Sequence, residues 1–239
     1  VSWINTAYPF AVAYWLVAGS IDINWLVGTI FFLGPYNLLM YGINDVFDYE
    51  SDLRNPRKGG IEGALLAPKW HRLTIWAAII SSAPFVLHLY VYGNASSNFW
   101  TSLILFTVVA YSAKGLRFKE KPFLDSLTSA SHFVGPMLIG ASLAGANLLE
   151  PKLLFIALAF ILWGIASHAF GAVQDVRADR EGGISSIATV IGARATVWFA
   201  FVAYAAAGIL VLFTGMPAAL SAIAALPYLA IVAPHLGIT

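Results

Sequence analysis

"KLLFIALAFILWGIASHAFGAV" occupies residues 152–173 and is followed directly by "QDVRADREGGI" at residues 174–184. The first stretch is long enough to cross a bilayer core, which takes about 20 helical residues. Backbone polar groups inside lipid must pair with one another, and this stretch is too long and too uniformly apolar for a barrel strand. It therefore predicts a transmembrane α-helix that ends at an acidic segment.

The composition of the whole chain has the same character. Of its 239 residues, 59% are hydrophobic and only 10% are charged, and the mean hydropathy is +0.78. Soluble domains carry about 25% charged residues, so lipid is expected to be the solvent for most of this surface. The net charge of +1 gives no indication of a nucleic-acid partner, and the lack of cysteine excludes disulfides, thiolate nucleophiles and cysteine metal sites.

The other apolar runs resemble the first in length. We predict an all-α polytopic membrane protein with eight visible transmembrane helices. The start of the chain has no cleavable signal pattern, and we expect it to be the ordered portion of a slightly longer protein. The predicted spans are residues 2–20, 24–43, 71–92, 98–113, 125–146, 152–173, 194–214 and 216–235.

The connectors between these runs alternate in character. Those at 44–70, 114–124 and 174–193 are long and polar, whereas the others are short and nearly uncharged. Every Lys and Arg except Lys152 lies in the long connectors or at the adjoining helix ends. Because basic residues accumulate on the cytoplasmic side, we predict a multi-pass cell-membrane protein with these three loops in the cytoplasm.

A short internal repeat divides the chain. "NDV" at 44–46 corresponds to "QDV" at 174–176, and "RKGGI" at 57–61 corresponds to "REGGI" at 180–184. Membrane proteins built from repeats tend to place their site where the halves meet. We predict one transmembrane domain, 1–239, made of two four-helix halves around a central cavity, about 1–113 and 125–239.

The repeated segments concentrate carboxylates at helical spacing. Asn44, Asp48 and Asp52 follow a four-residue step, which Asp175 and Asp179 repeat, and residues at that spacing share a helix face. Two carboxylate stripes held close together would repel unless cations lay between them, and hard oxygen ligands suit Mg²⁺ with phosphate oxygens and water. The predicted metal ligands are Asp45, Asp48, Asp52, Asp175 and Asp179.

Basic residues and glycines follow the acids. Arginine and lysine bind the outer oxygens of phosphorylated ligands, and the Gly-Gly pairs allow tight turns or close backbone approach. The candidates are Arg54, Arg57, Lys58 and Arg180.

Three other interpretations explain fewer features of the two acidic runs. A single acidic run in a loop is usually a solvated surface, but two runs with matched spacing, side and following residues argue against that. A transporter would place its ionisable groups near the bilayer midplane, whereas these cluster at one face. A CDP-alcohol phosphotransferase requires Asp-Gly followed by Ala-Arg, which neither run contains.

The pair of motifs, Asn44-x-x-x-Asp48-x-x-x-Asp52 and Asp175-x-x-x-Asp179, resembles the two aspartate-rich motifs of the UbiA superfamily of intramembrane prenyltransferases. The resemblance covers essentially the whole chain, although members usually have nine helices. It implies Mg²⁺ bridging an isoprenyl diphosphate, with Asn44 supporting the site. Members also have Tyr-x-x-x-Lys after the fourth helix; here the basic residue is displaced, so several residues are candidates for binding diphosphate beside Tyr111. These are Lys114, Arg117 and Lys119.

Three stretches resemble the carotenoid-extending branch, the lycopene elongases: "SWINTAYPFA" (2–11), "NDVFDYESDLRNPRKGGIEGALL" (44–66) and "RFKEKPFLDSLTSASHF" (117–133). This resemblance implies dimethylallyl diphosphate as donor and lycopene as acceptor, in the biosynthesis of carotenoids with fifty carbons. A quinone-precursor or glycerol-lipid acceptor is the alternative. The reaction class is transfer of an alkyl group.

The apolar spans supply candidates for the substrate walls. An allylic cation needs a dry pocket and is stabilised by aromatic faces. The candidates for cation stabilisation are Trp3, Tyr8, Phe31, Tyr36 and Tyr41, and those for substrate binding are Asn5, Tyr8, Asn37 and Tyr41. Two pairs seven residues apart, Asp125 with His132 and His168 with Asp175, each share a helix stripe, and their histidines are interpreted as interhelical hydrogen-bonding residues.

Overall fold

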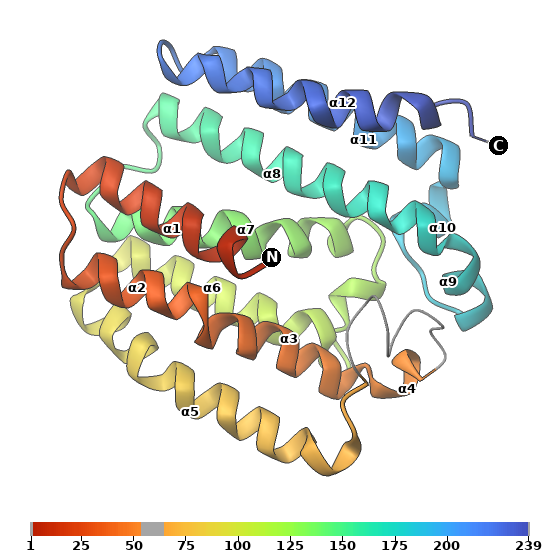
Figure 1. The fold of residues 1–239 in the computed structure, drawn as a ribbon, viewed down its shortest axis with the longest axis horizontal. Coiled ribbons are helices and arrows are strands. Elements are labelled where there is room, and N and C mark those ends of the chain that lie inside the picture. Colours follow the sequence, from red (N-terminus) through yellow and green to blue (C-terminus); the bar gives the residue numbers. More distant parts are fainter. Residues whose placement is uncertain (1, 54–64, 239) are drawn as a thin grey trace. The chain divides into compact units, whose positions relative to one another are not determined.

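A computed structural model describes residues 2–53 and 65–238, and this part of the chain is helical with no strands (Figure 1). The all-α class is therefore confirmed. The α-helices are α1 (Ser2–Ala18), α2 (Ile23–Leu33), α3 (Pro35–Phe47), α4 (Tyr49–Asp52), α5 (Pro68–Tyr92), α6 (Ala95–Ser112), α7 (Leu124–Leu143), α8 (Pro151–Ala172), α9 (Val176–Gly182), α10 (Ile187–Ile191), α11 (Ala193–Leu212) and α12 (Ala225–Val232). The 3-10 helices are η1 (Phe118–Glu120), η2 (Val173–Asp175), η3 (Ala218–Ala224) and η4 (Ala233–His235).

Each apolar run of the sequence is helical in the structure, and most helix ends lie within a few residues of the predicted ones. Within the described residues, five stretches are long and apolar enough to cross a membrane: Ile23–Phe47, Pro68–Tyr92, Pro151–Asp175, Ala193–Leu212 and Ala218–His235. A polytopic membrane protein is therefore the fold class, while the count of eight crossings stays a prediction.

The chain forms two compact units. The first contains residues 1–117 and 135–146, and the second contains residues 118–134 and 147–239. The boundary passes through α7, whose beginning belongs to the second unit and whose end belongs to the first. The division of the chain into halves at 113 and 125 stays a prediction.

Aromatic rings form the core of the first unit, where α1 packs on α2, and α3 packs on α5 and α6. The ring of Phe10 lies 5.2 Å from that of Phe32, and Phe32 lies 5.0 Å from Tyr36. All three are fully buried. A methyl group added at Gly28 would collide with the ring of Phe10, so the glycine allows α1 and α2 to lie close together.

The second predicted span is interrupted at Gly34-Pro35, where α2 ends and α3 begins. Proline has no N–H to continue the helical hydrogen-bond pattern. Next to the break, the carbonyl of Phe32 accepts hydrogen bonds from Thr6 Oγ1 of α1 and Asn37 Nδ2 of α3, each at 2.7 Å. Asn37 Nδ2 also donates to Thr6 Oγ1 at 2.8 Å, so a buried polar cluster joins three helices at the break.

In the second unit, α11 packs along α8 and against η3 and α12. A buried cluster that includes Ala166, Val197 and Tyr204 forms this core. Gly164 lies against Ala130, so α8 and the beginning of α7 approach closely. The last predicted span is a sequence of η3, α12 and η4 rather than one α-helix.

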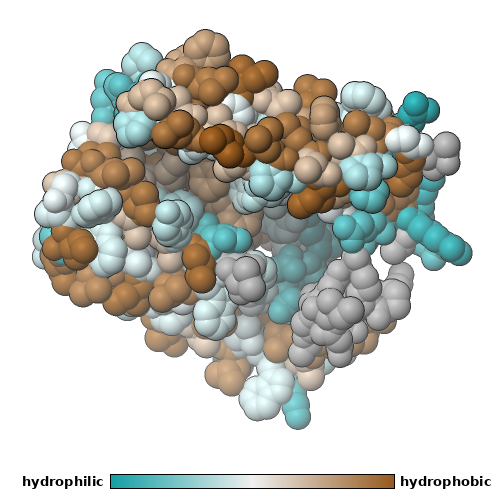
Figure 2. All heavy atoms as spheres, turned by 45° about the horizontal axis from the view of Figure 1, so that its top comes forward, coloured by the Kyte–Doolittle hydropathy of each residue, from teal (hydrophilic) through white to brown (hydrophobic). Residues whose placement is uncertain are grey.

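Large apolar side chains cover much of the surface of both units. Leu16 and Ile80 in the first unit are exposed, as is Ile223 in the second. The visible face is largely brown or pale in Figure 2, which marks hydrophobic and intermediate residues. A soluble protein rarely exposes so much contiguous apolar surface, and lipid is its natural covering.

Candidate functional site

The first aspartate motif, Asn44, Asp45, Asp48 and Asp52, lies where α3 continues into α4. The N–H of Asp48 donates to the carbonyl of Asn44 at 2.9 Å, and that of Asp52 donates to the carbonyl of Asp48 at 2.8 Å. The four-residue step is thus a continuous helical path, even though Asp48 is formally the residue between two helices. Asp48 is buried and the other members are partly buried.

Ser112 fixes the orientation of the asparagine in this motif. Its hydroxyl donates to Asn44 Oδ1 at 2.8 Å, and Ser112 itself is buried at the end of α6. The neighbouring Tyr111 is partly buried. Ser112 was not predicted, because it lies inside a stretch identified only by its tyrosine and basic residues.

The basic candidates after α6 differ in their surroundings. Lys114 is exposed, whereas Arg117 and Lys119 are partly buried. Arg117 has a φ of 41°, in the left-handed region that non-glycine residues adopt infrequently. Lys119 belongs to η1. Which of the three binds diphosphate stays open. Arg54 and Lys58, with the rest of 54–64, lie outside the described residues.

The second aspartate motif, Asp175 and Asp179, lies where α8 and η2 continue into α9. Asp175 ends η2 and is the N-cap residue of α9, and both carboxylates are partly buried. Gly183 ends α9 with a φ of 69°, and the N–H of Ile184 donates to the carbonyl of Asp179 at 2.8 Å. The glycine of the repeated sequence is needed here because L-residues with side chains rarely adopt this conformation.

A second serine orients Asp179. Ser186 Oγ donates to Asp179 Oδ2 at 3.0 Å, and Ser186 is the N-cap residue of α10. On the opposite, exposed side of α9, Arg177 forms an ion pair with Glu181 at 3.1 Å. Arg180 is also exposed and lines a surface hollow of about 830 Å³ with Arg194 at the start of α11.

The candidate wall residues fall into two groups. Asn5, Tyr8 and Tyr41 are exposed on their helices. Asn37 is only 3% exposed, and its amide group is engaged at the break between α2 and α3. Phe31 and Tyr36 lie in the aromatic core, a placement that favours packing. The assignment of all wall residues to substrate binding stays a prediction.

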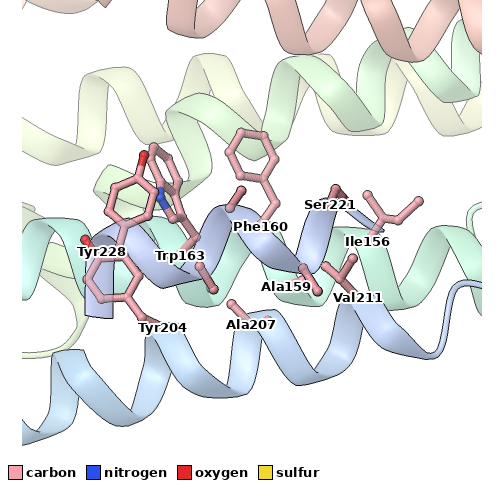
Figure 3. Close-up of a pocket in the computed structure, with 13 residues that line it drawn as sticks. Ile156, Ala159, Phe160, Trp163, Tyr204, Ala207, Val211, Ser221 and Tyr228 are labelled. Atoms are coloured by element: carbon pink, nitrogen blue, oxygen red, sulfur yellow. The ribbon is translucent and has the colours of Figure 1, made fainter. Parts of the chain in front are cut away.

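The second unit also contains an apolar pocket that the sequence did not predict. It has a volume of about 270 Å³ and lies among α8, α11, η3 and α12 (Figure 3). Trp163, Tyr204 and Tyr228 line it, with several alanines, and no lining residue is charged. The hydroxyl of Tyr204 is hydrogen-bonded to Ser167 at 2.8 Å.

Both motifs contain carboxylate groups, whose oxygens are the ligand type that Mg²⁺ prefers. Within residues 2–53 and 65–238, no three Asp, Glu or His side chains are close enough together to form a metal site by themselves. The metal-ligand role of the five aspartates stays a prediction.

Comparison with known families decides the classification. Residues 6–238 match the UbiA prenyltransferase family. The chain belongs to this family. The resemblance drawn from the two aspartate motifs is therefore confirmed.

Two relatives within the UbiA family are similar over most of this chain. The "C(50) beta-cyclic carotenoids biosynthesis protein LbtBC" of Dietzia sp. is 57% identical over 240 residues, covering 100% of this chain and 55% of that protein. A "lycopene elongase/hydratase" of Corynebacterium glutamicum is 54% identical over 229 residues, covering 95% of this chain and 79% of that protein. The chain thus spans about half the length of the first relative.

A solved UbiA homolog shares the fold. The structure of the Archaeoglobus fulgidus protein bound to DMAPP and Mg²⁺ superimposes with a TM-score of 0.76 at 18% identity, covering 96% of this chain and 82% of that one. Together with the apolar helices, this similarity establishes a multi-pass membrane protein of the UbiA fold.

Proposed function

We propose that this chain transfers a dimethylallyl group from its diphosphate to lycopene, in a Mg²⁺-dependent reaction of C50 carotenoid biosynthesis. The observation that carries the proposal is the pair of aspartate motifs, each lying where one helix continues into another and each with one member held by a serine hydroxyl. The choice of acceptor rests on the similarity to a lycopene elongase/hydratase at 54% identity. We place the motifs and their loops on the cytoplasmic side. The basic residues of the chain are concentrated in these loops, and basic residues accumulate on the cytoplasmic side of a membrane.

The residues fit a hydrated divalent cation. Mg²⁺ usually takes only one or two protein carboxylates, and phosphate oxygens and water complete its coordination. Asp48 and Asp52 would supply carboxylate oxygens from the first motif, and Asp175 and Asp179 from the second. Bound Mg²⁺ would neutralise the negative charge that develops on the departing diphosphate. The solved relative contains both DMAPP and Mg²⁺, which supports this choice.

The reaction separates charge along the substrate. The allylic carbon–oxygen bond breaks, its electron pair leaves with the diphosphate, and a double bond of the acceptor forms the new carbon–carbon bond. The resulting tertiary cation loses a proton to give an alkene, or adds water and then loses a proton to give an alcohol. Groups already in place where charge develops give the largest stabilisation, and Asn44, held by Ser112, is such a group.

The apolar parts of the chain have a different task in this proposal. Walls without water protect the cation until the acceptor reacts. Trp3, Tyr8 and Tyr41 are the aromatic candidates that are exposed enough to meet a substrate. The basic residues Lys114, Arg117, Lys119 and Arg180, with Arg54 and Lys58, would bind the diphosphate oxygens.

The deciding experiment supplies the full-length purified protein with labelled dimethylallyl diphosphate and one of three acceptors: lycopene, a hydroxybenzoate or a geranylgeranylated glycerol phosphate. We expect label to enter first a product five carbons longer than lycopene and then a product ten carbons longer. Activity should disappear with EDTA and return with Mg²⁺. Label entering the hydroxybenzoate or the glycerol lipid instead would show that lycopene is not the acceptor, while prenyl transfer would remain the reaction. Full activity in a metal-free preparation would refute the metal-dependent mechanism.

A further inference from the structure

A buried carboxylate outside both motifs lies at the start of α7 in the second unit. Asp125 is completely buried. Its Oδ1 accepts a hydrogen bond from the N–H of Ser126 at 2.6 Å and another from the Ser126 hydroxyl at 3.2 Å, and its Oδ2 accepts from the N–H of Ile187 at 3.1 Å. A buried charge is costly unless it is well hydrogen-bonded, so this arrangement is a built feature rather than an incidental contact.

One oxygen of Asp125 is bonded to the beginning of α10. Ile187 is the first residue of that helix, and its N–H is one of the donors that a helix cannot satisfy internally. The preceding Ser186 forms a reciprocal capping box with Thr189 and donates its hydroxyl to Asp179. Asp125 therefore holds the backbone immediately next to the serine that orients a carboxylate of the second motif.

The other oxygen of Asp125 is connected through the Ser126 hydroxyl to α8, the helix that precedes Asp175. The Ser126 hydroxyl is hydrogen-bonded to His168 Nδ1 at 3.1 Å. His168 lies on α8, seven residues before Asp175 and thus on the same stripe. A single side chain is in this way linked to α8, which precedes Asp175, and to the start of α10, where Ser186 contacts Asp179.

We propose that Asp125 is a positioning residue that sets the relative placement of Asp175 and Asp179. This inference rests on the proposed function, because it assumes that the two aspartates bind a metal-diphosphate. The geometry distinguishes it from a purely structural cap: a cap would need only the contact to Ile187, whereas Asp125 is also bonded to Ser126 and through it to His168. Partners that orient metal ligands typically change metal affinity by about 10- to 100-fold when removed.

The test uses Asp125→Asn in the full chain, purified in nanodiscs, with Mn²⁺ as the probe and inorganic diphosphate present. Asparagine retains only one acceptor oxygen, so it cannot serve Ser126 and Ile187 together. We expect Mn²⁺ binding, followed by electron paramagnetic resonance, to weaken about 10- to 100-fold. Amide hydrogen exchange across residues 187–191 should become faster even without metal, and KM for the donor should rise more than kcat falls.

Ser167→Ala is the matched control. It removes a side-chain hydrogen bond from the same helix as His168, but its partner is Tyr204 and not the Asp125 network. We expect this control to lower thermal stability without changing Mn²⁺ affinity. Unchanged Mn²⁺ affinity and donor KM in Asp125→Asn would overturn the proposal, whatever its stability.

A second pair of variants applies where Asp125→Asn does not fold. Ser186→Thr keeps a hydroxyl at the N-cap position, whereas Ser186→Ala removes both the cap and the contact to Asp179. We expect the alanine variant to lose Mn²⁺ affinity and the threonine variant to retain it. Equal affinities would refute the proposed connection from Asp125 through Ser186 to Asp179. A wild-type protein that binds Mn²⁺ and diphosphate but transfers no prenyl group would contradict the proposed function and leave this inference standing, whereas one that binds neither would overturn both.

Discussion

Two serines show how side chains outside the motifs prepare the site. Ser112 donates to Asn44, and Ser186 donates to Asp179, so each motif has one member whose orientation is fixed before any ligand arrives. Preorganised groups cost no rearrangement when charge develops during the reaction. Substitution of the aspartates tests the assignment of the site directly.

Replacing Asp48 or Asp179 by asparagine is expected to reduce kcat by about 10²- to 10³-fold with any acceptor, the size of effect seen when one electrostatic stabiliser is lost. The loss appears in kcat because the carboxylates act where charge develops. Glu181→Gln is the control, since that carboxylate lies on the same short helix as Asp179 but forms an exposed ion pair. Equal activity of Asp179→Asn and Glu181→Gln would contradict the assignment.

Asn37→Ala is expected to lower the free energy of unfolding by about 1–3 kcal/mol, because it removes the amide donor to Thr6 Oγ1 and one of the two donors to the buried carbonyl of Phe32. Thermal unfolding in detergent measures this effect. Asn5→Ala on the exposed side of α1 is the control and should be nearly neutral. If Asn37→Ala kept wild-type stability but changed the ratio of deprotonated to hydrated product, its role would be at the substrate wall instead.

At the scale of elements, close approach of helices depends on glycines. Gly28 faces the ring of Phe10 between α1 and α2, and Gly164 faces Ala130 between α8 and the start of α7. In a membrane, where lipid competes poorly with tight van der Waals packing, small residues of this kind are enriched at helix interfaces. Each allows an approach that a larger side chain would prevent.

Gly28→Val should therefore destabilise the first unit by about 1–3 kcal/mol, the usual cost of overfilling a packed interface. The measurement is the midpoint of thermal unfolding in detergent. Gly171→Ala in α8 is the matched control, because nothing lies within 4 Å of the added methyl group. A wild-type midpoint for Gly28→Val would show that α1 and α2 separate without cost.

Helix positions were predictable from the sequence to within a few residues, because long apolar runs in lipid have few alternatives to the helix. The break in the second span was missed, although Gly34-Pro35 is a known interruption signal, since the apolar run continues across it. The 3-10 turns of the last span were also missed. The contacts of Ser112 and Ser186 depend on which helices become neighbours, and no local pattern encodes that.

For the whole molecule, the relation between the two aspartate motifs is the main expectation from the sequence. A shared diphosphate requires the Asp48 and Asp175 stripes to converge, because Mg²⁺–oxygen bonds are about 2.1 Å long and carboxylates more than about 15 Å apart could not serve one diphosphate. The sequence contains no cysteine, so labels are easily placed at chosen positions.

Spin labels on Glu50→Cys and Glu181→Cys, one from each motif region, measure this relation directly. Both residues are exposed and neither is a proposed ligand. We expect a single short distance between the two labels. The distribution of that distance should narrow when Mg²⁺ and a non-hydrolysable donor analogue are added, since a bridging ligand restrains both motifs. A long distance that is unaffected by the ligand would exclude a common site.

The break at Gly34-Pro35 also has a consequence for biogenesis. The carbonyl of Phe32 is satisfied in part by Thr6, which belongs to the preceding helix. A second helix released alone into lipid would carry that carbonyl without one of its donors, and unsatisfied backbone groups are costly in hydrocarbon. The first two hydrophobic segments are therefore expected to enter the lipid together, with the earlier helix retained at the translocon until the later one has been made.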